Sequence, residues 1–304
     1  MLSLEAIYQA AERIAPYTHR TPILTSSSLD QLFGKRLFLK AEHLQKTGSF
    51  KARGAVNAAL QLEHPRGLIT VSSGNHAQAV AYAARILGVP ALIVMPEDAS
   101  ALKKAATRAY GAEVYDHGVI VENREEVART LTLETGYSFI HPFNDPRVMA
   151  GQGTLALEMA AQVPDLDAVL VAVGGGGMIA GGAAAMKALA PRVRVIGVEP
   201  EAANDAQRSL AAGRRIRLEQ APKTVADGVR TLALGEYPWE VIREQVDEIV
   251  SVPEEAILEA QGLLMSRTKQ VVEPTGALPL APLLAGQALP ERLGIVVCGG
   301  NWMP

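Results

Sequence analysis

The sequence predicts an α/β fold built on parallel sheets, and three observations support this. Short apolar runs rich in branched residues recur along the chain, at residues 68–71, 91–95, 168–173, 193–198 and 294–298. Longer helical patterns lie between them, at residues 77–87, 99–110, 123–135 and 152–161. The apolar runs also lack the alternating polar residues of a half-exposed strand. Strands buried on both faces and separated by helices are typical of parallel sheets.

The composition is that of a globular protein and excludes some classes of partner. The 304 residues are 48% hydrophobic and 20% charged, which suits one large or two medium domains. The net charge is −3 and no basic stripe is present, so we expect no nucleic-acid partner. Cys298 is the one cysteine, so no intramolecular disulfide can form, which fits a reducing cytosol.

Neither of two candidate segments has the pattern of an export signal or a membrane span. Residues 1–13 include Glu5 and Glu12 and predict an amphipathic helix, without the basic start and apolar stretch of a signal peptide. Residues 168–186 carry little charge, but six glycines interrupt them. We therefore expect a cytoplasmic protein with no membrane partner.

A run of glycines follows the strand predicted at residues 168–173. Gly174 to Gly177 would let successive backbone N–H groups converge on an anion at the start of the next helix, and a phosphate suits such a site. A tight strand-to-helix crossing would also require small residues. The spacing from Gly175 to Ala180, with Glu199 about twenty residues further on, also fits a dinucleotide-binding pattern. An NAD-dependent oxidoreductase therefore remains an alternative at this point.

A second loop, residues 72–76, lies between another predicted strand and helix. Its sequence is Ser72-Ser73-Gly74-Asn75-His76, and its hydroxyls and amide at a helix start could bind a small carboxylate. Plain helix capping is the alternative, although capping needs only one such side chain.

A third segment, residues 46–55, places a lysine beside an aromatic ring. Lys51 follows Phe50 in a turn that opens a helix. Most lysines are solvated, but a desolvated lysine amine can form an imine with a carbonyl compound.

The segment Ser49-Phe50-Lys51-x-Arg53-Gly54-Ala55 resembles the lysine motif of the fold-type II pyridoxal-phosphate enzymes. It is most similar to the serine/threonine dehydratases and serine racemases. The similarity continues in order along the chain, through residues 72–79, 141–143, 150–154, 174–178, 226–229, 273–275 and 298–301. The resemblance implies a tryptophan synthase β-like fold, with two open parallel-sheet α/β domains and the cofactor in the cleft. It implies a large domain of residues 1–60 and 146–304, a small domain of residues 61–145, and a homo-oligomer, either a dimer or a tetramer.

The resemblance also implies how pyridoxal 5′-phosphate would be held. Lys51 would form the Schiff base with the cofactor and later remove the α-proton of the substrate. Phe50 would pack on the pyridine ring, Asn75 would bind its phenolic oxygen, and Cys298 would lie at its nitrogen. The phosphate would be bound by Gly174, Gly175, Gly176, Gly177 and Met178. On this resemblance the NAD alternative is set aside.

Substrate and metal sites are implied in the same way. Ser72, Ser73 and His76 would line the site for the substrate carboxylate, with Ser73 as a catalytic group on the ring face opposite Lys51. Some family members bind a divalent ion where this chain has Glu199, Ala203 and Asp205. The two acids and the Ala203 carbonyl would then hold Mg²⁺, Mn²⁺ or Ca²⁺, with waters completing the coordination. Two surface acids after a strand are the alternative.

The resulting hypothesis is a dehydratase, or ammonia-lyase, that converts L-threonine and L-serine to 2-oxobutanoate or pyruvate and ammonia. A serine racemase with side elimination is the alternative, and a catalytically silent binding protein is a third. Phe143 is typical of threonine dehydratases, whereas animal serine racemases have asparagine there. The position of Cys298 is more often serine in this family. The chain stops just after Asn301, so we expect no C-terminal regulatory domain.

Overall fold

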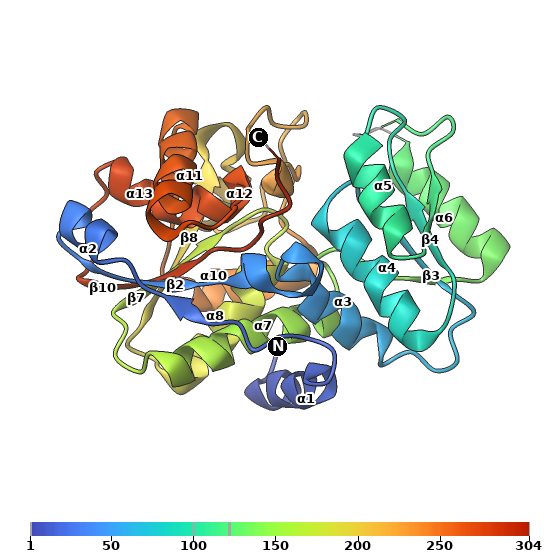
Figure 1. Ribbon diagram of the computed structural model, residues 1–304. Helices are drawn as coiled ribbons and strands as arrows, with labels where there is room; N and C mark the ends of the chain where they lie inside the picture. Colours follow the sequence, from blue (N-terminus) through green and yellow to red (C-terminus); the bar gives the residue numbers. More distant parts are fainter. Residues whose placement is uncertain (1, 100, 121–122, 304) are drawn as a thin grey trace.

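The computed structural model describes residues 2–99, 101–120 and 123–303, which form two α/β bodies side by side (Figure 1). The larger body is built on a six-stranded sheet, whose strand order is β1-β2-β10-β7-β8-β9. The bounds of these strands are, in that order, Ile23–Leu24, Arg36–Lys40, Arg292–Val296, Ala168–Ala172, Arg194–Pro200 and Glu248–Val252. The α/β fold is therefore confirmed.

Helices cover both faces of this sheet, because its central strands are apolar on both sides. All five residues of β7 are buried, as are the last six of β8. In Figure 1, α11 to α13 lie above the sheet, and α7 and α8 lie below it. The helices of this body are α1 (Leu4–Ile14), α2 (Ser27–Phe33), α7 (Pro146–Gln162), α8 (Gly177–Leu189), α9 (Asp205–Ala212), α10 (Glu236–Gln245), α11 (Glu254–Thr268), α12 (Pro274–Ala277) and α13 (Ala281–Leu284). Its short 3₁₀ helices are η1 (Glu42–Leu44), η2 (Lys46–Gly48), η3 (Glu201–Ala203), η4 (Asp227–Val229) and η5 (Leu278–Leu280).

The smaller body has a four-stranded parallel sheet of order β5-β4-β3-β6. Alternate residues of β3 and β4 point to opposite faces, so one core contains Leu68 and Ile93 and the other contains Ile69 and Leu92. Helices α3 and α4 contribute to the first core, and α6 contributes to the second. The elements are β3 (Leu68–Val71), β4 (Ala91–Val94), β5 (Glu113–Tyr115), β6 (Ser138–Phe139), α3 (Lys51–Ala59), α4 (Asn75–Leu87), α5 (Ala101–Ala109) and α6 (Arg124–Thr135).

The predicted elements agree closely with the observed ones, and five strands were missed. Strands β1, β2, β5, β6 and β9 had not been predicted, and β1 pairs with β2 in an antiparallel arrangement. The expectation of parallel sheets is therefore wrong for that edge pair. Met1 and Ser100, which the predicted helices at 1–13 and 99–110 include, lie outside the described residues.

The boundaries between the two bodies stay a proposal. All strands of the four-stranded sheet fall within residues 61–145, which supports the division into residues 1–60 with 146–304 and residues 61–145. Helix α3 nevertheless packs in the same core as α4, so it joins the two bodies.

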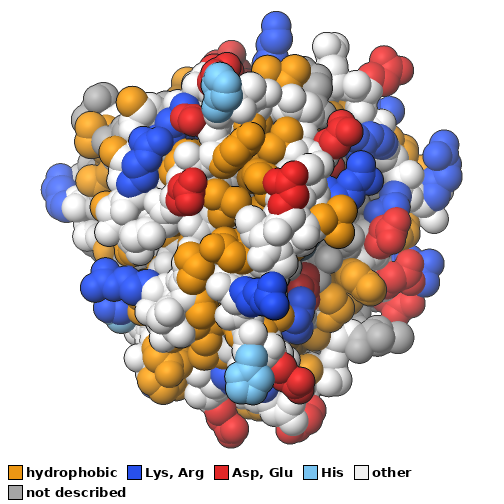
Figure 2. Space-filling view, turned by 90° about the vertical axis from the view of Figure 1, so that its right-hand side faces the viewer, with side chains coloured by type: hydrophobic (Ala, Val, Ile, Leu, Met, Phe, Trp, Pro, Cys, Tyr) orange, Lys and Arg blue, Asp and Glu red, His pale blue; other side chains and the backbone are white. Residues whose placement is uncertain are grey.

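No helix in the described part of the chain is long and apolar enough to cross a membrane. On the face shown in Figure 2, basic and acidic side chains are interspersed around apolar ones. That face therefore lacks the single-sign field that attracts nucleic acid.

Candidate active site

Two strand-to-helix loops and the turn that contains Lys51 form the candidate site. One loop joins β3 to α4, and the other joins β7 to α8, each at the carboxyl end of its strand. Ligands of open α/β sheets bind at these ends. Lys51 begins α3, and the backbone N–H of Phe50 donates to the Cys298 carbonyl at 3.1 Å. Ser49 also forms an isolated bridge with Gly299, so the lysine turn is fixed to the chain after β10.

The Lys51 amine is desolvated, as an imine-forming lysine requires. Its Nζ donates to the Pro142 carbonyl at 2.8 Å and lies 5.2 Å from the centroid of the Phe50 ring. Burial lowers the pKa of Lys51 to about 8, against a smaller opposing effect of Cys298. A useful fraction of the amine is therefore unprotonated and nucleophilic near neutral pH.

The glycine loop is shaped so that only glycine fits at its centre. Gly176 has φ +88°, in the left-handed region, and a Cβ at Gly175 would overlap the Phe143 ring. The first-turn N–H groups of the thirteen-residue helix α8 begin directly after it. Backbone N–H groups at a helix start bind phosphate well. The loop and this first turn consist of the residues predicted to bind it: Gly174, Gly175, Gly176, Gly177 and Met178.

A chain of amides orients Asn75. Asn301 Nδ2 donates to Asn75 Oδ1 at 2.7 Å and to the Thr47 carbonyl at 2.8 Å. Asn75 Nδ2 donates to Glu273 Oε1 at 2.7 Å, and the same nitrogen can donate its other hydrogen to a phenolic oxygen. Glu273 is buried, and burial with the nearby charge of Asp227 raises its pKa to about 7.

Glu273 and Asn301 had been given no role from the sequence, although both lie in segments that carry the family resemblance. Their contacts with Asn75 join positions 198 and 226 residues apart in the chain. Spacing along the sequence could not reveal such contacts. The one available signal was the presence of both residues in the quoted segments.

Cys298 is a neutral, buried thiol beside this group. Its Sγ–H donates to the Thr275 carbonyl at 3.3 Å. Burial, together with the charge of Glu273, raises the pKa of Cys298 well above its ordinary value. The thiol therefore carries no charge near neutral pH.

The loop before α4 leaves its helix start open. The N-cap position is Gly74, and no side chain caps the helix. Ser72 Oγ accepts from the Gly74 N–H at 3.2 Å, and Ser72 and Ser73 are half-buried. Plain capping therefore does not explain the two serines and the amide, and the open N–H groups of this helix start are suited to an anion such as a carboxylate.

The comparisons with known proteins agree with this geometry. The model of the family described as pyridoxal-phosphate dependent enzyme matches residues 14–299. The chain belongs to this family. Its relatives include L-threo-3-hydroxyaspartate ammonia-lyase of Saccharomyces cerevisiae, 44% identical over 97% of this chain and 92% of the relative. Human serine racemase is 44% identical over 99% of this chain and 91% of the relative.

Solved structures lead to the same family. A crystal structure of a threonine deaminase from T.th. is 64% identical, with a TM-score of 0.97, and the match covers 99% of this chain and 100% of that one. The maize serine racemase structure is 41% identical, with a TM-score of 0.95, covering 99% of this chain and 94% of that one. The chain is therefore a fold-type II pyridoxal-phosphate enzyme of the ammonia-lyase and racemase group.

In this pyridoxal-phosphate enzyme, Glu199 and Asp205 form a second group of buried acids. Glu199 is the last residue but one of β8, Asp205 begins α9, and both side chains are almost fully buried. The Glu199 carboxylate accepts the N–H groups of Ala206 and Gln207, at 3.1 and 2.8 Å. Burial raises the pKa of both acids, to about 7 for Asp205, and the charge of Asp205 adds to the effect on Glu199. The two are thus buried neighbours, not the surface acids of the alternative interpretation.

The two carboxylates could bind a cation if carbonyl and water oxygens supplied the remaining ligands. Neither carboxylate oxygen of Asp205 has a hydrogen-bond partner among the described residues. A divalent ion would satisfy both, and the Ala203 carbonyl lies in the same turn, η3. No group of three or more His, Cys, Asp or Glu residues able to hold a metal occurs in the described ranges. Any ion here would therefore depend on carbonyl and water ligands as well.

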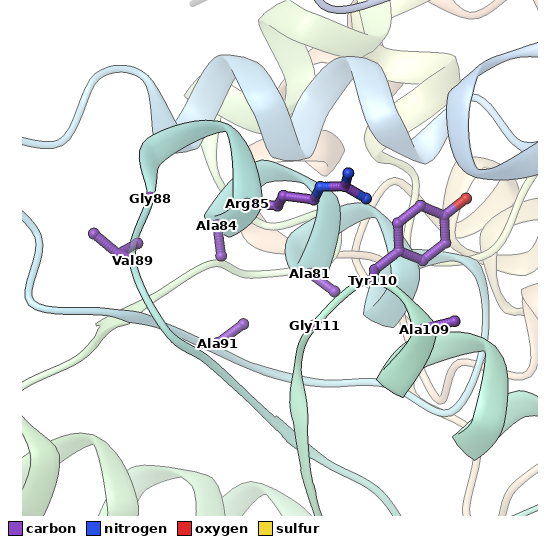
Figure 3. Close-up of a pocket in the computed structure, with 9 residues that line it drawn as sticks. All are labelled: Ala81, Ala84, Arg85, Gly88, Val89, Ala91, Ala109, Tyr110 and Gly111. Atoms are coloured by element: carbon purple, nitrogen blue, oxygen red, sulfur yellow. The ribbon is translucent and has the colours of Figure 1, made fainter.

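A hollow of about 420 Å³ lies elsewhere on the smaller body (Figure 3). The residues that line it come from the end of α4, the start of β4 and the end of α5, and no predicted site residue is among them: Ala81, Ala84, Arg85, Gly88, Val89, Ala91, Ala109, Tyr110 and Gly111. This hollow is separate from the candidate active site.

Proposed function

We propose that the chain is an ammonia-lyase that converts L-threonine, and also L-serine, to a 2-oxo acid and ammonia. The observation that supports this most is the half-buried Lys51 amine, bonded to the Pro142 carbonyl and with its pKa lowered to about 8, in a chain that also has a glycine loop before α8 and an open helix start at α4. The 64% identity to a threonine deaminase of known structure supports the choice of substrate.

Some residues of the site would bind the cofactor, and others would bind the substrate. Bound pyridoxal phosphate supplies the electron sink that makes the α-proton acidic. The glycine loop with Met178 would bind its phosphate, and Phe50 would pack on its ring. Asn75 would bind its phenolic oxygen, and Cys298 would lie at its pyridine nitrogen. Lys51 would hold its aldehyde carbon.

The chain would then orient the substrate and move one proton. Ser72, Ser73 and the first-turn N–H groups of α4, including that of His76, would hold the substrate carboxylate. Lys51 Nζ, once free, would remove the α-proton. Ser73 would lie on the opposite face, so racemisation would require a proton from its hydroxyl.

Two other activities have specific support and serve as the alternatives, namely elimination from hydroxyaspartate and racemisation of serine. Relatives of 44% and 46% identity are named L-threo-3-hydroxyaspartate ammonia-lyase, and others of 42% to 44% are named serine racemase. The test is 2-oxo acid formation from L-threonine, L-serine, D-serine and L-threo-3-hydroxyaspartate, with chiral analysis of recovered serine. The proposal fails if hydroxyaspartate has the highest kcat/KM, or if serine racemises faster than it is eliminated.

Replacement of Lys51 tests the centre of the proposal. Lys51→Ala should abolish turnover, because no other group is proposed to bond the cofactor aldehyde, while the melting temperature of the cofactor-free protein should stay nearly unchanged. Borohydride reduction should attach the cofactor to Lys51 in the wild type, as read by peptide mapping. Attachment to another lysine, or activity in Lys51→Ala, would contradict the assignment.

We also propose that Glu199, Asp205 and the Ala203 carbonyl hold Mg²⁺ or a similar ion. The support is the pair of unpartnered oxygens on the buried Asp205 carboxylate. Such an ion would stabilise the fold that contains it, since it binds only the folded chain.

A further inference from the structure

The hydrogen on the His76 ring is located by its partner. His76 lies in the first turn of α4, and its Nε2 is 3.1 Å from the carbonyl oxygen of Ile140. A carbonyl oxygen only accepts hydrogen bonds, so Nε2 must carry the hydrogen. In the neutral ring, Nδ1 is then a bare acceptor.

This acceptor is buried and unpaired. The His76 side chain is 2% exposed, and Nδ1 has no hydrogen-bond partner among the described residues. Burial, together with the charge of Lys51, lowers the pKa of His76 well below its ordinary value, so the ring is neutral. An unpaired buried acceptor is unfavourable, and at a functional site it indicates a missing donor.

Lys51 carries a matching donor. Its Nζ has one acceptor in the described structure, the Pro142 carbonyl at 2.8 Å. It lies near enough to His76 and His141 for its charge to lower the pKa of both. A neutral amine has two N–H groups and one lone pair, so one N–H stays without a partner.

The other titratable groups that face Lys51 cannot accept this N–H as well. His141 Nδ1 already accepts the N–H groups of Phe143 and Asn144, at 3.2 and 2.8 Å. Burial lowers the pKa of His141 to about 4, so the remaining nitrogen of this neutral ring carries the hydrogen and donates. The Cys298 thiol is neutral, its hydrogen is donated to the Thr275 carbonyl, and its sulfur is only a weak acceptor.

We propose that His76 is a positioning residue whose Nδ1 accepts a hydrogen bond from the free Lys51 amine. With one N–H held by Pro142 and the other by His76, the lone pair of Lys51 has a single direction. An amine fixed in this way removes the α-proton more readily than one that rotates freely. The inference rests on the proposed role of Lys51 as the base.

The side chain and the backbone of His76 would then have different roles. The neutral ring has no N–H on the Nδ1 side, so it cannot donate there to a substrate carboxylate. The backbone N–H of His76, in the open first turn of α4, can do so. The side chain would thus act on Lys51, and the backbone on the substrate.

Two substitutions separate the two ring nitrogens. In His76→Gln the side-chain amide can still donate to the Ile140 carbonyl, as Nε2 does, but no acceptor remains at the position of Nδ1. In His76→Asn the shorter side chain places its carbonyl oxygen near the position of Nδ1. The two variants are similar in polarity, and each is the control for the other.

The first measurement uses the cofactor-free protein and no substrate. The pH dependence of Lys51 labelling by an amine reagent, read by peptide mapping, should have its midpoint near 8 in the wild type. His76→Gln should move the midpoint down by about one pH unit, because an acceptor that stabilises the ammonium is lost. His76→Asn should restore most of the shift.

The second measurement is kinetic, with α-deuterated and ordinary substrate. His76→Gln should lower kcat by about tenfold or more, change KM by less than about threefold, and increase the deuterium isotope effect. His76→Asn should recover most of kcat. The inference is wrong if His76→Gln raises KM alone, if its labelling midpoint and isotope effect are those of the wild type, or if both variants lose only thermal stability. If the label in the wild type is on another lysine, the proposed function itself has failed.

Discussion

Two groups of buried charges differ in how completely their polar atoms are paired. One is the Arg53 cluster, defined as Lys40, Glu42, Arg53 and Glu158. The other is the acid pair of Glu199 and Asp205. Both are largely removed from water, and the two differ in whether opposite charge is present.

The Arg53 cluster is balanced and fully bonded. Arg53 donates to both oxygens of Glu42, each at 2.8 Å, and to both oxygens of Glu158, at 2.7 and 2.9 Å. Lys40 Nζ uses its three hydrogens on Glu158, Gln162 and the Thr21 carbonyl. Although burial opposes ionisation of Glu42, the charge and hydrogen bonds of Arg53 hold the Glu42 pKa below its ordinary value.

The acid pair has no compensating positive charge among the described contacts, and its hydrogen bonds are incomplete. Burial raises the pKa of both acids, and both oxygens of Asp205 lack partners among the described residues. We infer that a buried charged group whose hydrogen bonds are all formed within the protein has a structural role. A buried charged group whose polar atoms lack partners indicates a binding site, here for a cation. In the same way, the unpaired Nδ1 of His76 indicates that a hydrogen-bond donor is missing.

Breaking the balanced cluster should have the largest effect on stability. Arg53→Met leaves the buried Glu42 carboxylate without its ion-pair partner and Glu158 with Lys40 alone, so it should lower the free energy of unfolding by about 3–5 kcal/mol. The control is Arg194→Met, which breaks an ion pair with Glu248 whose side chains are 43% and 45% exposed and should lower it by less than about 1 kcal/mol. Urea unfolding of both variants measures the difference. Equal losses would mean that the Arg53 cluster does not behave as a buried, fully bonded group.

The same contrast explains what the sequence could and could not predict. The two candidate binding loops could be proposed because their residues are contiguous and follow apolar strands. The Arg53 cluster was not found, because Arg53 and Glu158 are 105 residues apart. Strand β2 was missed for a related reason: it ends at Lys40, a fully buried lysine whose ion-pair partner is the distant Glu158. Apolar patterning cannot identify a strand whose buried charge is balanced through tertiary contacts.

The acid pair should make stability depend on pH in a way that a metal ion abolishes. The folded pKa of Asp205, about 7, exceeds its ordinary value of 3.8, so between these pH values only the folded state holds the proton. Stability from this proton is fully present below pH 3.8 and is lost as the pH rises through 7. In chelator-treated protein, the unfolding free energy should fall by up to about 1.4 kcal/mol per pH unit between about pH 5 and 7.

Mg²⁺ should flatten this slope, because the ion replaces the proton on the carboxylates. Asp205→Asn should reduce the slope without Mg²⁺, since the amide does not titrate in this range, and the remaining slope would come from Glu199 and Glu273, whose pKa values burial also raises. Thermal unfolding across this pH range, with and without the ion, measures both effects. A slope that neither Mg²⁺ nor Asp205→Asn changes would reduce the pair to buried acids with no ligand.

The smallest effect is expected at Cys298, a buried polar group whose one donor is already used. Its Sγ–H donates to the Thr275 carbonyl at 3.3 Å, and a serine hydroxyl can make the same bond. Cys298→Ser should therefore change kcat by less than about threefold, since a neutral group still faces the proposed position of the pyridine nitrogen. Cys298→Asp is the contrasting variant, because a carboxylate there would favour a protonated ring, prolong the carbanion, and raise solvent-deuterium exchange at the α-carbon relative to 2-oxo acid formation. If this ratio is the same in both variants with cofactor still bound, Cys298 does not lie at the ring nitrogen.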